Sequence, residues 1–143
     1  MNITDFSSDD LSFAVFQANE GKKLIEGWGN VSGFSAANLL DKAFITIIKN
    51  GKNKNYSNED IANRFGYLFG ELLSDNFSFS WKYVEDEYGK EPALIESQTG
   101  SIIFPINAVW KRLEPELIIE PFFANIYESL KKHINSLSKT DDK

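Results

Sequence analysis

The sequence contains no cysteine and a single histidine, His133, among its 143 residues. The lack of cysteine excludes disulfide bonds, thiolate metal ligands and thiol nucleophiles. One histidine also excludes histidine-rich metal centres, which need several imidazole ligands. The neighbouring Lys131 and Lys132 disfavour a protonated His133 and make a general-base role harder to build. We therefore expect His133 to be a surface residue near a helix end.

Basic residues are in the minority, with 15 Lys and Arg against 21 Asp and Glu, and the formal charge is −6. Nucleic-acid and anionic-membrane binding both need a basic surface, so this balance argues against either partner. The acidic start, with Asp5, Asp9 and Asp10, does not resemble a secretory signal, and no apolar run is long enough to cross a bilayer. These features predict a cytoplasmic protein.

The common catalytic and nucleotide-binding motifs are also missing. No Gly-x-Ser-x-Gly elbow occurs, and no second histidine could activate a serine. The glycines around Trp28 lack the lysine and the spacing of a phosphate-binding loop. We therefore expect no cofactor and no resident metal, and a protein that is not an enzyme.

Hydrophobic residues make up 42% of the chain and include twelve Phe, which is enough for a substantial core. Their spacing predicts one α+β domain over residues 1–137 and a frayed polar tail over residues 138–143. The expected helices cover residues 8–26, 35–50 and 57–76, followed by a short helix near residue 110 and a long C-terminal helix from Pro121. The expected caps of the first three are Ser7 or Ser8, then Ser35, then Ser57. The expected sheet is a three-stranded antiparallel meander made of Phe77–Val84, Ala93–Glu96 and Ser101–Phe104. The first helix is expected to bury an apolar face made of Leu11, Ala14, Val15, Ala18 and Ile25.

Two local patterns predict close packing in the second half of the chain. Gly66 and Gly70 lie four residues apart in the third helix, where each costs roughly 1 kcal/mol relative to alanine. We expect another backbone to approach this helix at both positions. Trp110 shares a helix face with apolar neighbours, so we expect it in the core, with Lys111 and Arg112 pointing outward.

The most concentrated charge is an acidic cluster at the predicted hairpin turn, made of Glu85, Asp86, Glu87, Glu91 and Glu96. Its spacing matches no calcium loop, and neither histidine nor cysteine completes a transition-metal site. The pattern is compatible with a solvated turn, with a patch that binds a partner, and with a carboxylate pair in catalysis. In the binding interpretation Tyr88 is the expected anchor, since tyrosine is favoured at interface hot spots.

Several segments of the second half together resemble a small bacterial domain family of unknown function. They are Gly66-Tyr67-Leu68-Phe69-Gly70-Glu71, Trp81, Asp86-Glu87-Tyr88-Gly89, Pro92-Ala93-Leu94, and Pro105 with Trp110-Lys111-Arg112-Leu113. The resemblance covers roughly residues 57–130 and implies a glycine-containing helix, a Trp-bearing strand, an acidic hairpin and a Lys-Arg helix. It implies no catalytic residues.

The overall type, a small acidic α+β domain without cysteine, is similar to bacterial toxin-immunity proteins. Our leading hypothesis is a non-enzymatic immunity protein that binds a basic toxin domain through Glu85, Asp86, Glu87, Tyr88 and Glu91. The alternative is a regulatory or housekeeping domain that binds a small ligand or another protein. An enzyme with a carboxylate pair is the third hypothesis. The high aromatic content also leaves a homodimer open.

Overall fold

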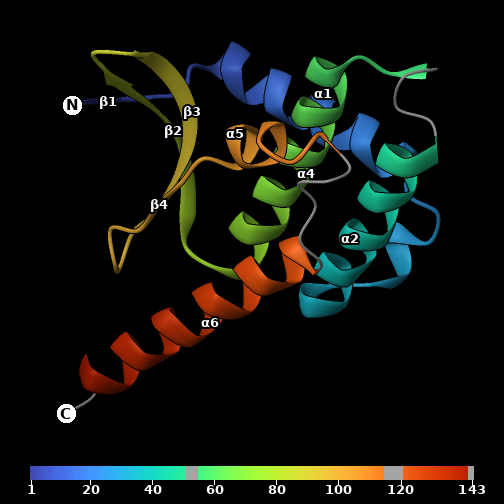
Figure 1. Cartoon of the computed structure of the whole chain (residues 1–143). Coiled ribbons are helices and arrows are strands. Elements are labelled where there is room, and N and C mark those ends of the chain that lie inside the picture. Colours follow the sequence, from blue (N-terminus) through green and yellow to red (C-terminus); the bar gives the residue numbers. More distant parts are fainter. Residues whose placement is uncertain (51–54, 115–120, 142–143) are drawn as a thin grey trace.

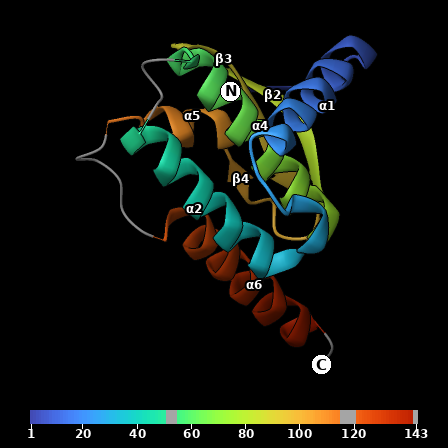
Figure 2. The same ribbon diagram turned by 90° about the vertical axis from the view of Figure 1, so that its right-hand side faces the viewer.

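The computed structural model describes residues 1–50, 55–114 and 121–141. Along the chain these form β1 (Asn2–Asp5), α1 (Ser8–Lys23), the short 3₁₀ helix η1 (Trp28–Asn30), α2 (Gly33–Asn50), α4 (Asn58–Asn76), β2 (Phe79–Asp86), β3 (Gly89–Glu96), β4 (Ile102–Ile103), α5 (Pro105–Trp110) and α6 (Phe122–Asp141). The fold is α+β, as predicted. Figures 1 and 2 show that the helices gather on one side of a small curved sheet.

The sheet has four antiparallel strands in the order β1-β2-β3-β4, so the predicted number of three is wrong. The meander of β2, β3 and β4 is confirmed, and β1 adds to the free edge of β2, with Asn2 opposite Glu85 and Asp5 opposite Lys82. Every residue of β1 is exposed, so the segment has no alternation of buried and exposed side chains. Its partner lies about eighty residues away, and local sequence carries no sign of that pairing.

Helix α4 lies at the centre of the molecule, in contact with α1, α2, α5 and β2 (Figure 1). It begins as predicted, since Ser57 Oγ accepts the backbone N–H of Asp60 at 3.0 Å. A Cβ on Gly66 would lie 2.7 Å from the Cα of Ile106, which confirms close backbone approach there. At Gly70 the close neighbour is instead the ring of Trp81, so the expected backbone contact is wrong at that position.

Helix α1 begins as predicted but buries a narrower face than expected. Ser7 Oγ accepts the N–H of Asp10 at 3.1 Å, and the Asp10 carboxylate accepts the N–H of Ser7 at 2.9 Å. The buried positions are the small residues Ala14, Ala18 and Gly21. A Cβ on Gly21 would lie 2.6 Å from the carbonyl oxygen of Arg64 on α4. The two helices therefore pack too closely for large side chains between them, and the predicted Leu11 and Val15 are exposed instead.

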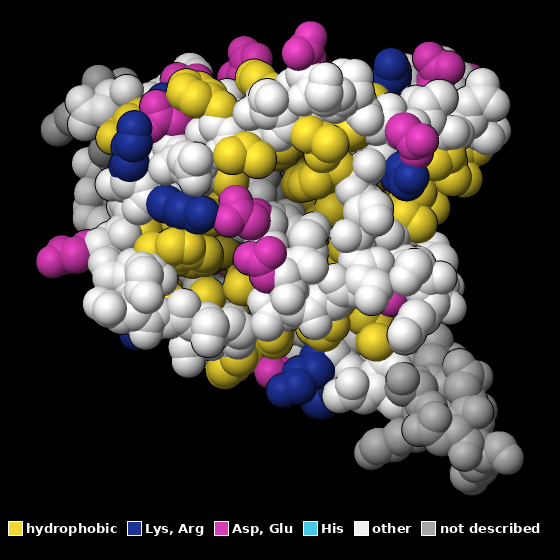
Figure 3. All heavy atoms as spheres, turned by 180° about the vertical axis from the view of Figure 1, so that it is seen from behind, with side chains coloured by type: hydrophobic (Ala, Val, Ile, Leu, Met, Phe, Trp, Pro, Cys, Tyr) yellow, Lys and Arg dark blue, Asp and Glu magenta, His cyan; other side chains and the backbone are white. Residues whose placement is uncertain are grey.

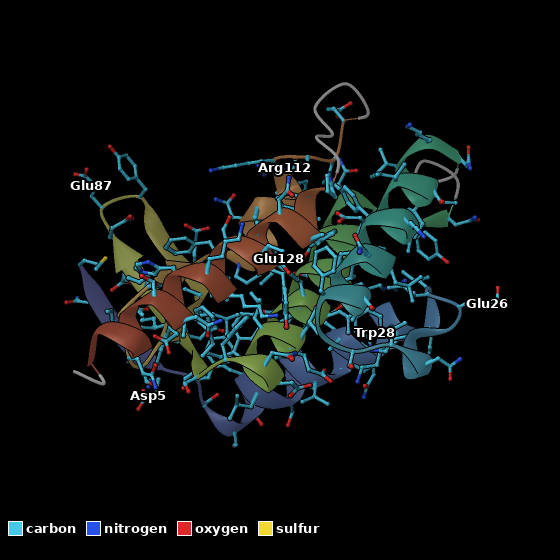
Figure 4. All side chains as sticks on the ribbon, turned by 90° about the horizontal axis from the view of Figure 1, so that it is seen from below. Asp5, Glu26, Trp28, Glu87, Arg112 and Glu128 are labelled. Atoms are coloured by element: carbon cyan, nitrogen blue, oxygen red, sulfur yellow. The ribbon has the colours of Figure 1, made fainter. Side chains whose placement is uncertain are left out.

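Helix α5 packs against α4 through Ile106 and Val109, while Trp110 is 44% exposed. The expected burial of Trp110 is therefore wrong. A helix of six residues presents only one short apolar face, and that face is already occupied. The Arg112 guanidinium lies 4.0 Å from the centroid of the Phe122 ring, which fixes this cation against α6 (Figure 4).

Helix α6 is anchored by a buried acid that the sequence did not indicate. The Asp41 carboxylate, on α2, accepts the N–H groups of Phe123 at 2.7 Å and Ala124 at 3.0 Å. These are first-turn N–H groups that have no partner within the helix, so Asp41 caps α6 from a distance. The helix continues to Asp141, into the segment for which the sequence predicts fraying, and residues 142–143 lie outside the described part.

Candidate binding site on the acidic hairpin

The β2–β3 hairpin ends in a tight turn formed by Glu87 and Tyr88 (Figure 4). Asp86 and Gly89 are the last paired residues on either side of it. The backbone N–H of Tyr88 donates to a carboxylate oxygen of Asp86 at 2.8 Å. Gly89 adopts a φ of 134°, a region that side-chain-bearing residues rarely occupy. The turn therefore has a defined geometry set by its own residues.

All five residues predicted to bind a partner are exposed on this hairpin: Glu85, Asp86, Glu87, Tyr88 and Glu91. Tyr88 is 89% exposed. A tyrosine side chain has only two rotatable χ angles, so little conformational entropy is lost when it is immobilised in a contact. The turn thus presents one large amphipathic side chain among four carboxylates.

The four carboxylates are distributed over both faces of the hairpin. Glu85 lies opposite Lys90, and Val84 lies opposite Glu91. Because side chains alternate along a strand, Glu85 and Lys90 share one face while Asp86 and Glu91 share the other. A shallow hollow of about 360 Å³ lies between Asp86, Tyr88, Gly89, Lys90 and Glu91. The more uniformly acidic face is therefore the one that carries Asp86 and Glu91.

Strand β2 of the hairpin is fixed to β1 by strand pairing and to α1 through Tyr83. The Lys90 ammonium lies 4.5 Å from the centroid of the Tyr83 ring, and the Tyr83 hydroxyl donates to Asp10 at 3.0 Å. Hydrogen bonds from the backbone and the hydroxyl of Ser7 lower the pKa of Asp10. Burial, and then the hydrogen bond to Asp10, raises the pKa of Tyr83. These contacts hold the hairpin in place as far as Tyr83, while the turn beyond it extends into solvent.

Glu96 does not belong to the surface cluster in which the sequence placed it. It is buried, with 1% exposure, at the other end of β3. One of its carboxylate oxygens accepts the backbone N–H groups of Gln98 at 2.9 Å and Thr99 at 2.6 Å. Glu96 therefore stabilises the turn between β3 and β4.

No group of three or more His, Asp or Glu side chains in the described part of the chain is arranged to hold a metal ion. His133 is exposed on α6, as expected from its position in the sequence. Among the described helices, none is long and apolar enough to cross a membrane.

A family model named Domain of unknown function (DUF3806) matches residues 42–122, more than half of the chain. The chain belongs to the DUF3806 family. The expected resemblance to a small domain family of unknown function is therefore confirmed. The comparisons with curated proteins and with solved structures give no match.

The DUF3806 match begins within α2 and ends at the first residue of α6. It includes α4, the acidic hairpin and α5, but neither β1 nor α1. The candidate site therefore lies on the part of the chain that defines the family. The DUF3806 description assigns no activity and no functional residues.

Outside the DUF3806 segment, α1 exposes a surface that the sequence analysis missed. Four large apolar side chains of this helix are between 46% and 57% exposed: Leu11, Phe13, Val15 and Phe16. Figure 3 shows several groups of apolar side chains exposed on this rear side of the molecule. The spacing of Ala14, Ala18 and Gly21 could have indicated which face of α1 is buried, because small residues four and three apart lie on one closely packed helix face.

A groove lies beside this exposed side of α1. One hollow of about 270 Å³ is lined by Leu11, Val15, Tyr67 and Trp81, among others, and an adjoining hollow of about 470 Å³ shares Leu11 and Trp81. The ion pair between Lys22 and Glu71, 2.7 Å long, lies at its edge. Burial raises the pKa of Tyr67 to about 12, so its hydroxyl is neutral at physiological pH.

Proposed function

We propose that this DUF3806 protein is a non-enzymatic binding protein that engages a basic protein partner through the tip of the β2–β3 hairpin. The observation that carries the proposal is the 89% exposure of Tyr88 on an ordered turn flanked by four exposed carboxylates. Tyrosine is enriched among the residues that dominate interface energies. The turn is already ordered, so contact with Tyr88 requires little further ordering of the backbone.

Electrostatics supports a basic partner. The net charge of −6 and the exposed acids at the tip give an attractive field for a positively charged surface. Such attraction accelerates encounter and weakens as salt shortens the screening length to about 8 Å at physiological ionic strength. Binding through this hairpin is therefore expected to be salt-sensitive.

The most concrete form of this proposal is an immunity protein that neutralises a toxin by covering a basic substrate cleft. It is supported by the size, acidity and exposed hairpin, and by analogy of overall type. The alternative is a regulatory or housekeeping domain that binds a small ligand or another protein. A hollow of about 290 Å³ beside Trp28, lined also by Glu71 and Asp75, favours that alternative (Figure 4).

The test compares partner capture by matched charge-reversal variants. The hairpin variant carries Glu85→Lys, Glu87→Lys and Glu91→Lys, which leaves intact the hydrogen bond that the Tyr88 N–H donates to Asp86. The control carries Glu26→Lys, Asp75→Lys and Glu114→Lys at exposed positions elsewhere, with the same change in net charge. Each tagged protein is expressed in its host, recovered at low and moderate salt, and titrated against the captured protein once that is identified.

We expect the wild type and the control to retain a stoichiometric, salt-sensitive basic partner. The hairpin variant and Tyr88→Ala should bind it at least tenfold more weakly, the loss from Tyr88 being about 1.4 kcal/mol or more. Equal affinity of all four proteins would contradict the proposed site. Loss in the control alone would favour the hollow beside Trp28, which Asp75 lines.

A further inference from the structure

The side chains of α1 are arranged in the reverse of the usual order for a surface helix. Its inner face consists of Ala14, Ala18 and Gly21. Its large apolar residues are about half exposed around the rest of the helix, and only Phe13 among them makes a ring contact with α4, 5.6 Å from the centroid of the Tyr67 ring. A helix on the outside of a domain normally buries its large apolar residues and exposes polar ones. Clustered apolar side chains on a surface generally indicate an interaction site. The exposed side of α1 is therefore a candidate interaction surface.

The polar residues towards the two ends of α1 are complementary when the helix is reversed, whereas Leu11 then falls opposite Glu20. About a centre between Val15 and Phe16, Ser12 and Asn19 are equidistant, as are Asp9 and Lys22, and Ser8 and Lys23. An interface with twofold symmetry requires this property, because each residue must find its counterpart on an identical surface. We propose that α1 packs antiparallel against α1 of a second copy of this chain, forming a homodimer.

The charges of α1 select the antiparallel arrangement. Asp9 lies in the first turn, and Lys22 and Lys23 lie in the last. Antiparallel packing places Asp9 beside the last turn of the partner helix, where both the lysines and the helix dipole are favourable to it. Parallel packing would place acids beside acids and lysines beside lysines. Lys22 binds Glu71 at 2.7 Å, and Lys23 binds Glu20 of its own helix at 3.1 Å. The Lys23 side chain is the more exposed of the two, at 74% against 34%, so Lys23 is the main partner for Asp9.

The apolar residues form the centre of the contact. Val15 and Phe16 lie at the symmetry point, and Leu11 borders the groove beside α1. Two helices of this length make a small interface, near the lower limit of about 1,200 Å² for specific complexes. We therefore expect a dissociation constant in the micromolar range, with monomer and dimer both populated across ordinary laboratory concentrations.

Single-cysteine variants test this arrangement directly, because the chain has no cysteine of its own. The two copies of Val15→Cys meet near the symmetry point and should form a disulfide under mild oxidation. The two copies of Ser8→Cys are about 22 Å apart along the helix axis, too far for a bond that needs Cα atoms about 4.4–6.8 Å apart. A mixture of Ser8→Cys and Lys23→Cys should again cross-link, as a heterodimer.

Sedimentation between about 1 and 300 μM supplies the second measurement. Phe16→Glu should weaken association at least tenfold, whereas Phe34→Glu, the same change at an exposed phenylalanine of α2, should leave it unchanged. A wild type that stays monomeric over this range would overturn the proposal. A dimer insensitive to Phe16→Glu, or cross-linked through Ser8→Cys alone, would overturn its placement on α1 in antiparallel order. Both measurements use this chain alone, so their outcome does not depend on the proposed partner of the hairpin.

Discussion

At the residue scale, Asp41 shows how a buried carboxylate can join two distant elements. It is only 6% exposed, and it accepts two backbone N–H groups of a helix more than eighty residues later. Acidic side chains are rarely buried without such partners. Its burial could not be predicted from the sequence, because the spacing around Asp41 fits an ordinary amphipathic helix and the groups it binds are known only from the fold.

Replacing Asp41 should therefore destabilise the whole domain. Asp41→Ala leaves the N–H groups of Phe123 and Ala124 buried without an acceptor, and we expect it to lower the free energy of unfolding by about 3 kcal/mol. Asp41→Asn retains one acceptor oxygen and should cost less. Urea denaturation measures both. Asp75→Ala, at an exposed acid of α4, is the control and should change stability by no more than about 0.5 kcal/mol. Equal stability of Asp41→Ala and the control would refute the capping role.

At the element scale, the starts of α1 and α4 were predictable and the outer faces of the helices were not; α2 begins at Gly33 and not at the expected residue 35. Ser7 and Ser57 cap α1 and α4 as expected, since a cap depends only on residues within the next turn. The exposed position of Leu11 depends on how closely α1 approaches α4, which local spacing does not contain. The hairpin turn was likewise predicted from its own residues, whereas the groove beside α1 needs three elements to be placed first.

Replacing Gly66 of α4 by alanine has two opposite effects on stability, one from helix propensity and one from packing against α5. Gly66→Ala should gain about 1 kcal/mol from helix propensity. The new Cβ would lie 2.7 Å from the backbone of Ile106, and forced repacking of this kind costs about 1–3 kcal/mol. Because backbone cannot rotate away as a side chain can, we expect a net loss of stability in thermal unfolding. Gly29→Ala is the matched control, with no heavy atom within 4 Å of the added Cβ, and should be tolerated. A higher melting temperature for Gly66→Ala would show that α5 moves away at little cost.

At the scale of the whole molecule, the boundaries of the DUF3806 match and those of the core do not coincide. The match begins at residue 42, yet α1 covers α4 and Phe6 stacks on the sheet aromatics. The Phe6 ring centroid lies 5.5 Å from that of Trp81 and 4.6 Å from that of Tyr83. The first thirty residues therefore complete a core whose other half lies within the family segment.

This dependence predicts that residues 33–143 alone do not form the native domain, although they contain the entire DUF3806 match. Removing residues 1–32 strips α1 from α4 and exposes side chains such as Leu68, which is fully buried in the intact chain. We expect this fragment to lose its cooperative thermal transition and to bind a hydrophobic dye. Removing residues 1–5 alone deletes the exposed strand β1 but keeps Phe6 and α1, so that variant should still unfold cooperatively at a lower temperature. If residues 33–143 unfold in a sharp transition at the wild-type temperature, the DUF3806 segment folds without α1. The loss expected here instead makes the inner side of α1, with Ala14, Ala18 and Gly21, part of the fold.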